Sequence, residues 1–163
     1  MKDKDGLRKE IAQHFRKHCS PCTGSCCNVE LEEGFMAFRY EADKLQPTHR
    51  RDCGRVSFVS FNNDRCEYSG SQACRLDLSD RPLDCLSYPV YPSIRFKEDG
   101  GKEVDGLVVR RYCPSSKSIS EDAELLGLIR EFWELTADDI PAADLQEWFS
   151  DREYWSEKNL IRV

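Results

Sequence analysis

The sequence lacks the long apolar runs that membranes and secretion signals require. No run approaches the ~18 apolar residues that span a bilayer. The charged start, Met1-Lys2-Asp3-Lys4-Asp5, is not followed by the apolar core of a signal peptide. We therefore expect a cytoplasmic protein without membrane association. In a reducing compartment, an abundance of cysteine indicates metal or redox chemistry more than disulfides.

A basic surface is also missing. The net charge is −6, and residues 121–163 carry twelve acids against four bases. Nucleic-acid binding domains present basic patches, so nucleic acid is not an expected partner, whereas an unknown protein partner remains open.

The sequence contains no Gly-rich phosphate loop, and no nucleophile stands with a recognisable base. Whether the chain is an enzyme is therefore left open, and a non-catalytic role is favoured.

Cysteine is what the chain has in excess, with nine residues in a length of 163. A chain of this length is expected to form one domain over residues 1–163 and to bury roughly 70% of its unfolded surface. It does not need disulfides merely to compensate for small size. Nine is an odd number, so complete pairing within one chain is impossible. The count fits two sets of four ligands and one additional thiol.

Four of these cysteines lie within nine positions, in the pattern Cys19-x2-Cys22-x3-Cys26-Cys27. Two residues between Cys19 and Cys22 allow one tight turn to present both sulfurs to one ion. Zinc takes four thiolate or imidazole ligands in a tetrahedron, and iron–sulfur clusters also take four thiolates. Adjacent Cys26 and Cys27 point in different directions on any regular backbone, which suits them to two different sites.

Several familiar metal patterns are excluded by the spacing. A second CxxC pair is absent, so the chain is not an ordinary zinc ribbon, and the runs of bacterial and plant ferredoxins do not match. A thioredoxin-like motif would need a βαβ context that the pattern does not predict. Cys53 lies in a predicted connector at 47–54, without a close cysteine partner, and is our choice for the additional thiol.

Hydrophobic periodicity predicts an α+β fold: a small cysteine-rich domain with short strands, a hairpin, flanking helices and irregular loops around the metal. The expected helices cover 6–18, 41–45, a short stretch after Pro82, a stretch after a capping box at Ser118–Glu121, and a stretch after Pro141. The expected strands cover Val29–Leu31, Val56–Phe61 and a hairpin from Ile94 to Tyr112, with an irregular path at Pro92. Residues 19–114 would form the metal-binding core, with acidic helices at 115–163 packed on it.

His14 and His18 lie four residues apart on the first expected helix, so both can face one ion. The alternative is a pair of surface residues on a basic helix face, and this is the favoured interpretation. His18 has the better case for a metal because it adjoins Cys19.

The complete pattern runs from Cys19-x2-Cys22-x3-Cys26-Cys27 through Cys66, Cys74 and Arg81-Pro82-x2-Cys85-x2-Tyr88-Pro89 to Cys113-Pro114. It resembles the cysteine-cluster family, also called YkgJ-type, whose members are described as zinc- or iron-chelating. The resemblance covers residues 19–114. Leu86 stands where that family usually has arginine.

The resemblance implies eight metal ligands and leaves Cys53 outside the set. The implied ligands are Cys19, Cys22, Cys26, Cys27, Cys66, Cys74, Cys85 and Cys113. Eight thiolates divide into two tetrahedral sites, which favours about two zinc ions with a structural role. Iron, or an iron–sulfur cluster with a redox or enzyme-accessory role, is the alternative.

Overall fold

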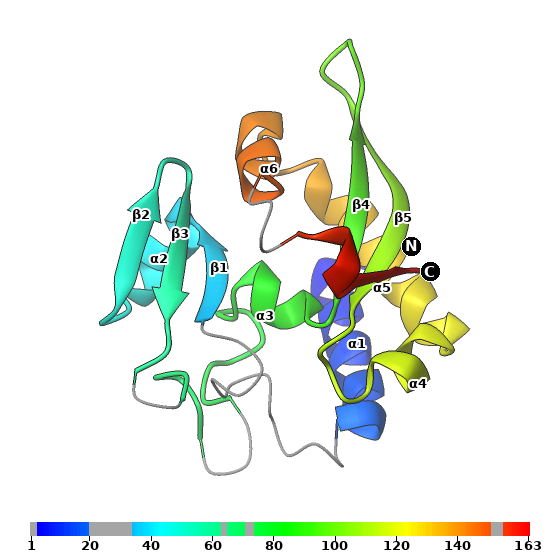
Figure 1. The fold of residues 1–163 in the computed structure, drawn as a ribbon, viewed down its shortest axis with the longest axis horizontal. Coiled ribbons are helices and arrows are strands. Elements are labelled where there is room, and N and C mark those ends of the chain that lie inside the picture. Colours follow the sequence, from blue (N-terminus) through cyan, green and yellow to red (C-terminus); the bar gives the residue numbers. More distant parts are fainter. Residues whose placement is uncertain (1–2, 20–33, 63–64, 71–73, 151–154) are drawn as a thin grey trace.

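The structure is a computed structural model that describes residues 3–19, 34–62, 65–70, 74–150 and 155–163, with Cys19 described by its backbone alone. The chain is α+β (Figure 1). Its helices are α1 (Lys4–Cys19), α2 (Arg39–Leu45), α3 (Leu83–Ser87), α4 (Ser116–Ser120), α5 (Ala123–Ala137), α6 (Ala142–Trp148) and the 3-10 helix η3 (Glu157–Asn159). Its strands are β1 (Gly34–Phe38), β2 (Arg50–Cys53), β3 (Val56–Ser60), β4 (Val90–Phe96), β5 (Lys102–Arg110) and β6 (Leu160–Arg162).

The strands form two separate antiparallel sheets of three strands each. In the first, β3 lies between β1 and β2, and in the second, β5 lies between β4 and β6. Figure 1 shows α3 between the two sheets. Because α3 contacts β1 and leads directly into β4, it connects the two halves of the fold.

The main core forms around α5, whose apolar stripe Leu125, Leu128, Ile129 and Phe132 is buried. This helix packs against α1 and against one face of the second sheet. Lys102 of β5 donates hydrogen bonds to the carbonyl oxygens of Ala137 and Ile140 at the C-terminal end of α5. A cation at that end also complements the helix dipole. None of the helices in the described ranges is long and apolar enough to cross a membrane.

Strand β1 contributes to two cores because both of its faces are covered. Met36 and Phe38 belong to the main core, whereas Phe35 and Ala37 join Ala42, Val59 and Cys66 in a second cluster. Successive side chains of a strand point to opposite faces, so a strand buried on both sides reads as a continuous apolar run. The sequence Gly-Phe-Met-Ala-Phe does not alternate between apolar and polar residues, and for this reason the strand is not predicted from the sequence.

The structure confirms most of the expected elements. The helix at 6–18 forms as α1, the turn at 41–45 as α2, the strand after Val56 as β3, the hairpin as β4 and β5, and the helix after Pro141 as α6. Trp155 also packs back onto the body of the protein, against Tyr91, Trp148 and Phe149. The expected strand at Val29–Leu31 lies outside the described residues.

Other expectations were wrong. The connector predicted at 47–54 contains β2, whose charged residues occupy an edge of the sheet, where charge discourages pairing with other chains. Pro92 lies within β4 instead of interrupting it, because an edge strand tolerates the missing N–H group. The predicted capping box at Ser118–Glu121 does not form, since Ser118 lies inside α4 and Asp122 caps α5.

Gly34 is required by the close approach of β1 and β3. A Cβ atom added at Gly34 would collide with the carbonyl oxygen of Val59, whereas one added at Gly127 of α5 would meet open space. We predict that Gly34→Ala lowers the free energy of unfolding by about 1–3 kcal/mol through overpacking. Gly127→Ala is the control and should raise it by about 0.5–1 kcal/mol, because alanine favours helix. Urea unfolding measures both changes, and equal effects would contradict this account of β1.

Candidate metal centre

The eight predicted ligands fall into two groups with respect to the structure. The positions of Cys66, Cys74, Cys85 and Cys113 are described, and for Cys19 the end of α1 is described. Cys22, Cys26 and Cys27 lie outside the described residues. Cys66 and Cys113 are buried, Cys74 is half-buried and Cys85 is exposed.

Cys66 and Cys74 lie on the two arms of a short turn structure. The N–H of Ser69 donates to the carbonyl oxygen of Cys66 (2.9 Å), and Ser69 pairs with Cys74 in an isolated antiparallel bridge. The Tyr68 hydroxyl donates to the carbonyl oxygen of Leu45 (3.1 Å) and so holds the turn on α2. Burial raises the pKa of Tyr68 to about 12, so this hydroxyl keeps its proton. The backbone thus brings two predicted ligands onto one local structure.

Cys85 is positioned by a buried carboxylate beside it. Asp84 is 3% exposed and accepts hydrogen bonds from the N–H of Met36 (2.7 Å) and from the Tyr91 hydroxyl (2.5 Å). These bonds tie α3 to β1 and to β4. Trp133 of α5 adds a third connection, because its indole N–H donates to the Ser87 hydroxyl (3.0 Å). The helix that carries Cys85 is therefore fixed against three other elements.

Glu41 of α2 reinforces the same junction. Its carboxylate accepts hydrogen bonds from the N–H groups of Phe38 and Leu83, both at 2.9 Å. Burial raises the pKa of Glu41 to about 7, with a smaller contribution from the nearby Asp84 carboxylate. One carboxylate thus binds the backbone at the start of α2 and at the start of α3.

Cys113 lies next to the segment that leads into the N-terminal cysteines. The Ser115 hydroxyl donates to the carbonyl oxygen of His18 (2.7 Å), which is the residue before Cys19. The N–H of Ser116 donates to the carbonyl oxygen of Cys113 (2.9 Å), so this turn is itself ordered by hydrogen bonds. The first and the last of the predicted ligands in the sequence therefore occupy neighbouring backbone.

Among the described residues, the two histidines of α1 contact acids. His18 places Nε2 2.8 Å from Asp122 and Nδ1 3.1 Å from the Ser118 hydroxyl. His14 lies 3.7 Å from the carboxylates of both Asp122 and Glu124. These contacts attach α1 to the start of α5, and the favoured interpretation as simple surface residues therefore missed a structural role.

The Ser118, His18 and Asp122 contacts do not form a catalytic triad. The Ser118 hydroxyl donates to the carbonyl oxygen of Ser115 (3.0 Å), so its proton is directed away from the imidazole. Asp122 accepts from the N–H of Leu125 (3.0 Å) as the N-cap of α5. This bond, followed by the His18 contact, lowers the pKa of Asp122 to about 2. An aspartate three residues before an apolar helical stripe was the available sequence signal for this cap.

Cys53 stands apart from the other described cysteines. It ends β2, is exposed, and pairs across the sheet with Val56. The other end of β3, Ser60, pairs with Gly34. Since a strand rises ~3.4 Å per residue, the four steps from Val56 to Ser60 separate these two ends by about 14 Å.

The described ends of the elements that lead to the other cysteines lie toward the opposite end of the fold. Figure 1 shows the C-terminal end of α1, the start of β1, the end of β3 and the start of β4 toward one side of the molecule. The turn between β2 and β3, next to Cys53, lies toward the other side. That turn contacts α6, because the N–H of Arg55 donates to Glu147 (3.1 Å) and its guanidinium donates to Asp144 (2.9 Å).

Within the part of the chain that the structure describes, no three His, Cys, Asp or Glu side chains gather into a group that could hold a metal ion. The described thiols are the soft ligands that zinc and iron–sulfur clusters take. Comparison with known proteins adds no relative, since no family model, no curated protein and no solved structure matches the chain.

Asp122 supports both a helix cap and the attachment of α1. We predict that Asp122→Ala lowers the free energy of unfolding by about 1–2 kcal/mol, the usual cost of losing an N-cap. Because the folded pKa is depressed, this contribution is present above the ordinary pKa of 3.8 and is lost as pH falls through about 2. Thermal unfolding at pH 7 tests the change. Glu121→Ala, at the exposed position before Asp122, is the control. An equal loss of stability in Glu121→Ala would refute the role of Asp122 as the N-cap of α5.

Glu41 should make stability depend on pH in the opposite direction. Its folded pKa of about 7 exceeds the ordinary 4.5, so its contribution is present below pH 4.5 and is lost as pH rises through about 7. We predict that Glu41→Gln flattens the fall in urea-unfolding midpoint between pH 5 and pH 7.5. Glu134→Gln, at an exposed position of α5, should leave that fall unchanged. The same pH dependence in wild type and Glu41→Gln would contradict the assignment.

Proposed function

We propose that the chain is a metal-binding cysteine-cluster protein whose eight predicted thiolates hold zinc or iron, in two four-cysteine sites with a structural role. The ligands would be Cys19, Cys22, Cys26, Cys27, Cys66, Cys74, Cys85 and Cys113. The resemblance to the cysteine-cluster family belongs to this proposal and is based on the cysteine pattern alone.

The observation that carries the proposal is the separation of Cys53 from the end of its sheet where the chain continues toward the other described cysteines. The sheet register puts Cys53 about 14 Å along the strands from the end where the chain continues toward Cys66. Sequence spacing and three-dimensional placement therefore select the same additional thiol. Independent agreement on Cys53 supports a ligand set of eight.

Local backbone geometry supports thiol pairs as the units of the two sites. Cys66 and Cys74 share one turn structure, and Cys113 neighbours the end of α1 that leads to Cys19. Two pairs of thiolates complete one tetrahedral zinc site. A site closed by four protein ligands has no open position for substrate, and its binding free energy adds to the stability of the fold.

An iron–sulfur cluster with a redox or enzyme-accessory role is the second candidate. It is favoured by the exposure of Cys85, because a solvent-exposed ligand gives an electron-transfer partner access to a cluster. Zinc is preferred because eight thiolates form two tetrahedral sites without inorganic sulfide.

Cys85 and Cys53 provide a matched pair of variants, since both thiols are exposed. We predict that Cys85→Ser lowers the metal bound per chain by at least one equivalent, whereas Cys53→Ser leaves it unchanged. Elemental analysis of protein purified without oxygen measures both. Equal metal content in the two variants, or equal loss from both, would contradict the proposed ligand set.

A further inference from the structure

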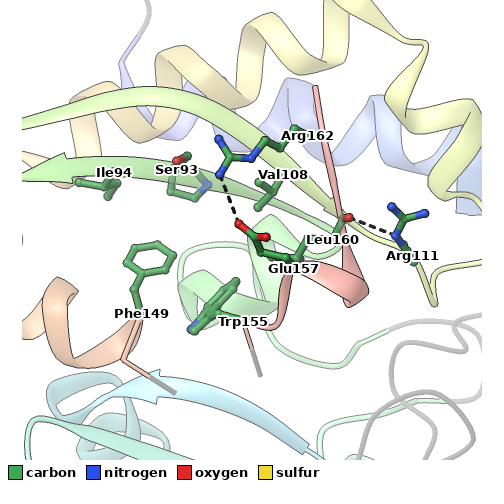
Figure 2. A pocket seen from close by; sticks show the side chains of 10 residues that line it. Ser93, Ile94, Val108, Arg111, Phe149, Trp155, Glu157, Leu160 and Arg162 are labelled. Atoms are coloured by element: carbon green, nitrogen blue, oxygen red, sulfur yellow. Dashed lines mark hydrogen bonds and ion pairs between the residues drawn. The ribbon is translucent and has the colours of Figure 1, made fainter. Parts of the chain in front are cut away.

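A pocket of about 470 Å³ lies between the second sheet and the C-terminal segment, and none of the described cysteines lines it (Figure 2). Strands β4 and β5 contribute Ser93, Ile94 and Val108 to its lining. The opposite wall comes from Phe149 and Trp155. Leu107 and Val109 of β5 belong to the core with α5, and Val108 between them points to the other face of the sheet. The pocket therefore occupies the face that α5 does not cover.

The aromatic wall is held in place by several contacts. The Trp155 indole N–H donates to the carbonyl oxygen of Trp148 (2.6 Å), which fixes the orientation of the ring. The Trp155 ring also meets the Tyr91 ring edge-on, with centroids 4.9 Å apart, and the Phe149 ring at the same distance. Phe149 and Trp155 thus form a preorganised aromatic surface, against which a flat ring can stack at little entropic cost.

The rim of the pocket carries net positive charge. Arg111 donates from Nε to the carbonyl oxygen of Leu160 (3.1 Å), an interaction drawn in Figure 2. Among the described residues, the terminal nitrogens of this exposed guanidinium have no hydrogen-bond or ion-pair partner. Glu157 and Arg162 form an exposed ion pair at 3.7 Å and largely offset each other. One guanidinium at the rim therefore remains available for an anion.

The strand β6 is what gives the pocket its third side. Leu160 pairs with Arg110 and Arg162 pairs with Val108, so the C-terminal segment is attached to β5 by backbone hydrogen bonds. The N–H of Val163 also donates to the carbonyl oxygen of Leu107 (3.0 Å). The pocket is thus formed by paired backbone on one side and packed aromatic rings on the other.

We propose that this pocket binds a small planar aromatic molecule that carries one anionic group, either phosphate or carboxylate. The ring stacks on Phe149 and Trp155, and the anion accepts hydrogen bonds from Arg111. A planar guanidinium recognises both anions with two donors. A volume of 470 Å³ lies within the range of about 300–1,000 Å³ of small-molecule sites. None of the residues that line this pocket is a predicted metal ligand.

Three probes that share one ring system separate the two contributions. They are 1-naphthyl phosphate, 1-naphthoate and 1-naphthol, titrated into the full-length chain while the indole N–H signals of its three tryptophans are followed by NMR. We expect a saturable shift of the Trp155 signal with at least one of the two anions, and binding at least tenfold weaker for naphthol. The signal of Trp133, deep in the core, should not move. The anion that binds more tightly identifies whether the site prefers phosphate or carboxylate.

Variants at the rim and the floor locate the binding site. Arg111→Gln should weaken binding of the anionic probe by about tenfold or more, the usual effect of losing charge-assisted hydrogen bonds. The same variant should leave the affinity for naphthol unchanged. Arg95→Gln is the matched control, because Arg95 pairs with Asp105 on the exposed part of the hairpin. Ser93→Phe should fill the pocket and abolish binding of all three probes. The absence of a saturable Trp155 shift with either anion, equal affinity for naphthol, or equal effects of Arg111→Gln and Arg95→Gln would overturn the proposal.

Discussion

The buried carboxylate of Asp84 is the interaction on which the arrangement of the two sheets depends. It accepts hydrogen bonds from Met36 of β1 and Tyr91 of β4, and it lies on the short helix that connects the two halves of the fold. A buried acceptor left without these donors costs about 1–3 kcal/mol, so the bonds fix one geometry. Since Cys85 is the next residue, the same contacts also fix the backbone of a predicted ligand.

The same design is repeated at other cysteines, where polar contacts of neighbouring residues order the backbone. Ser115 attaches the turn after Cys113 to the end of α1, and Tyr68 attaches the turn between Cys66 and Ser69 to α2. Cys53 lies instead at an exposed strand end whose turn contacts α6. Among the described cysteines, Cys53 is therefore the one that lies at this end of the fold, and its separation supports the proposed metal sites.

The sequence predicted the elements whose burial pattern has a clear period and missed those that do not. The stripe at Leu125, Leu128, Ile129 and Phe132 identified α5 because one face of that helix is buried. Strand β1 is buried on both faces, and β2 consists largely of charged residues at a sheet edge, so neither shows the alternation of a strand. For the candidate site, spacing singled out Cys53. The roles of Asp84 and His18 depend on contacts between residues far apart in the chain, which no local pattern encodes.

Metal and sulfide analysis of the wild-type chain, purified without oxygen, tests the central claim most directly. The account predicts about two zinc ions per chain and no acid-labile sulfide, with loss of the native fold when a chelator removes the metal. Iron with stoichiometric acid-labile sulfide would instead support the second candidate, an iron–sulfur cluster. Less than one equivalent of any transition metal, in a protein that remains folded, would contradict the account.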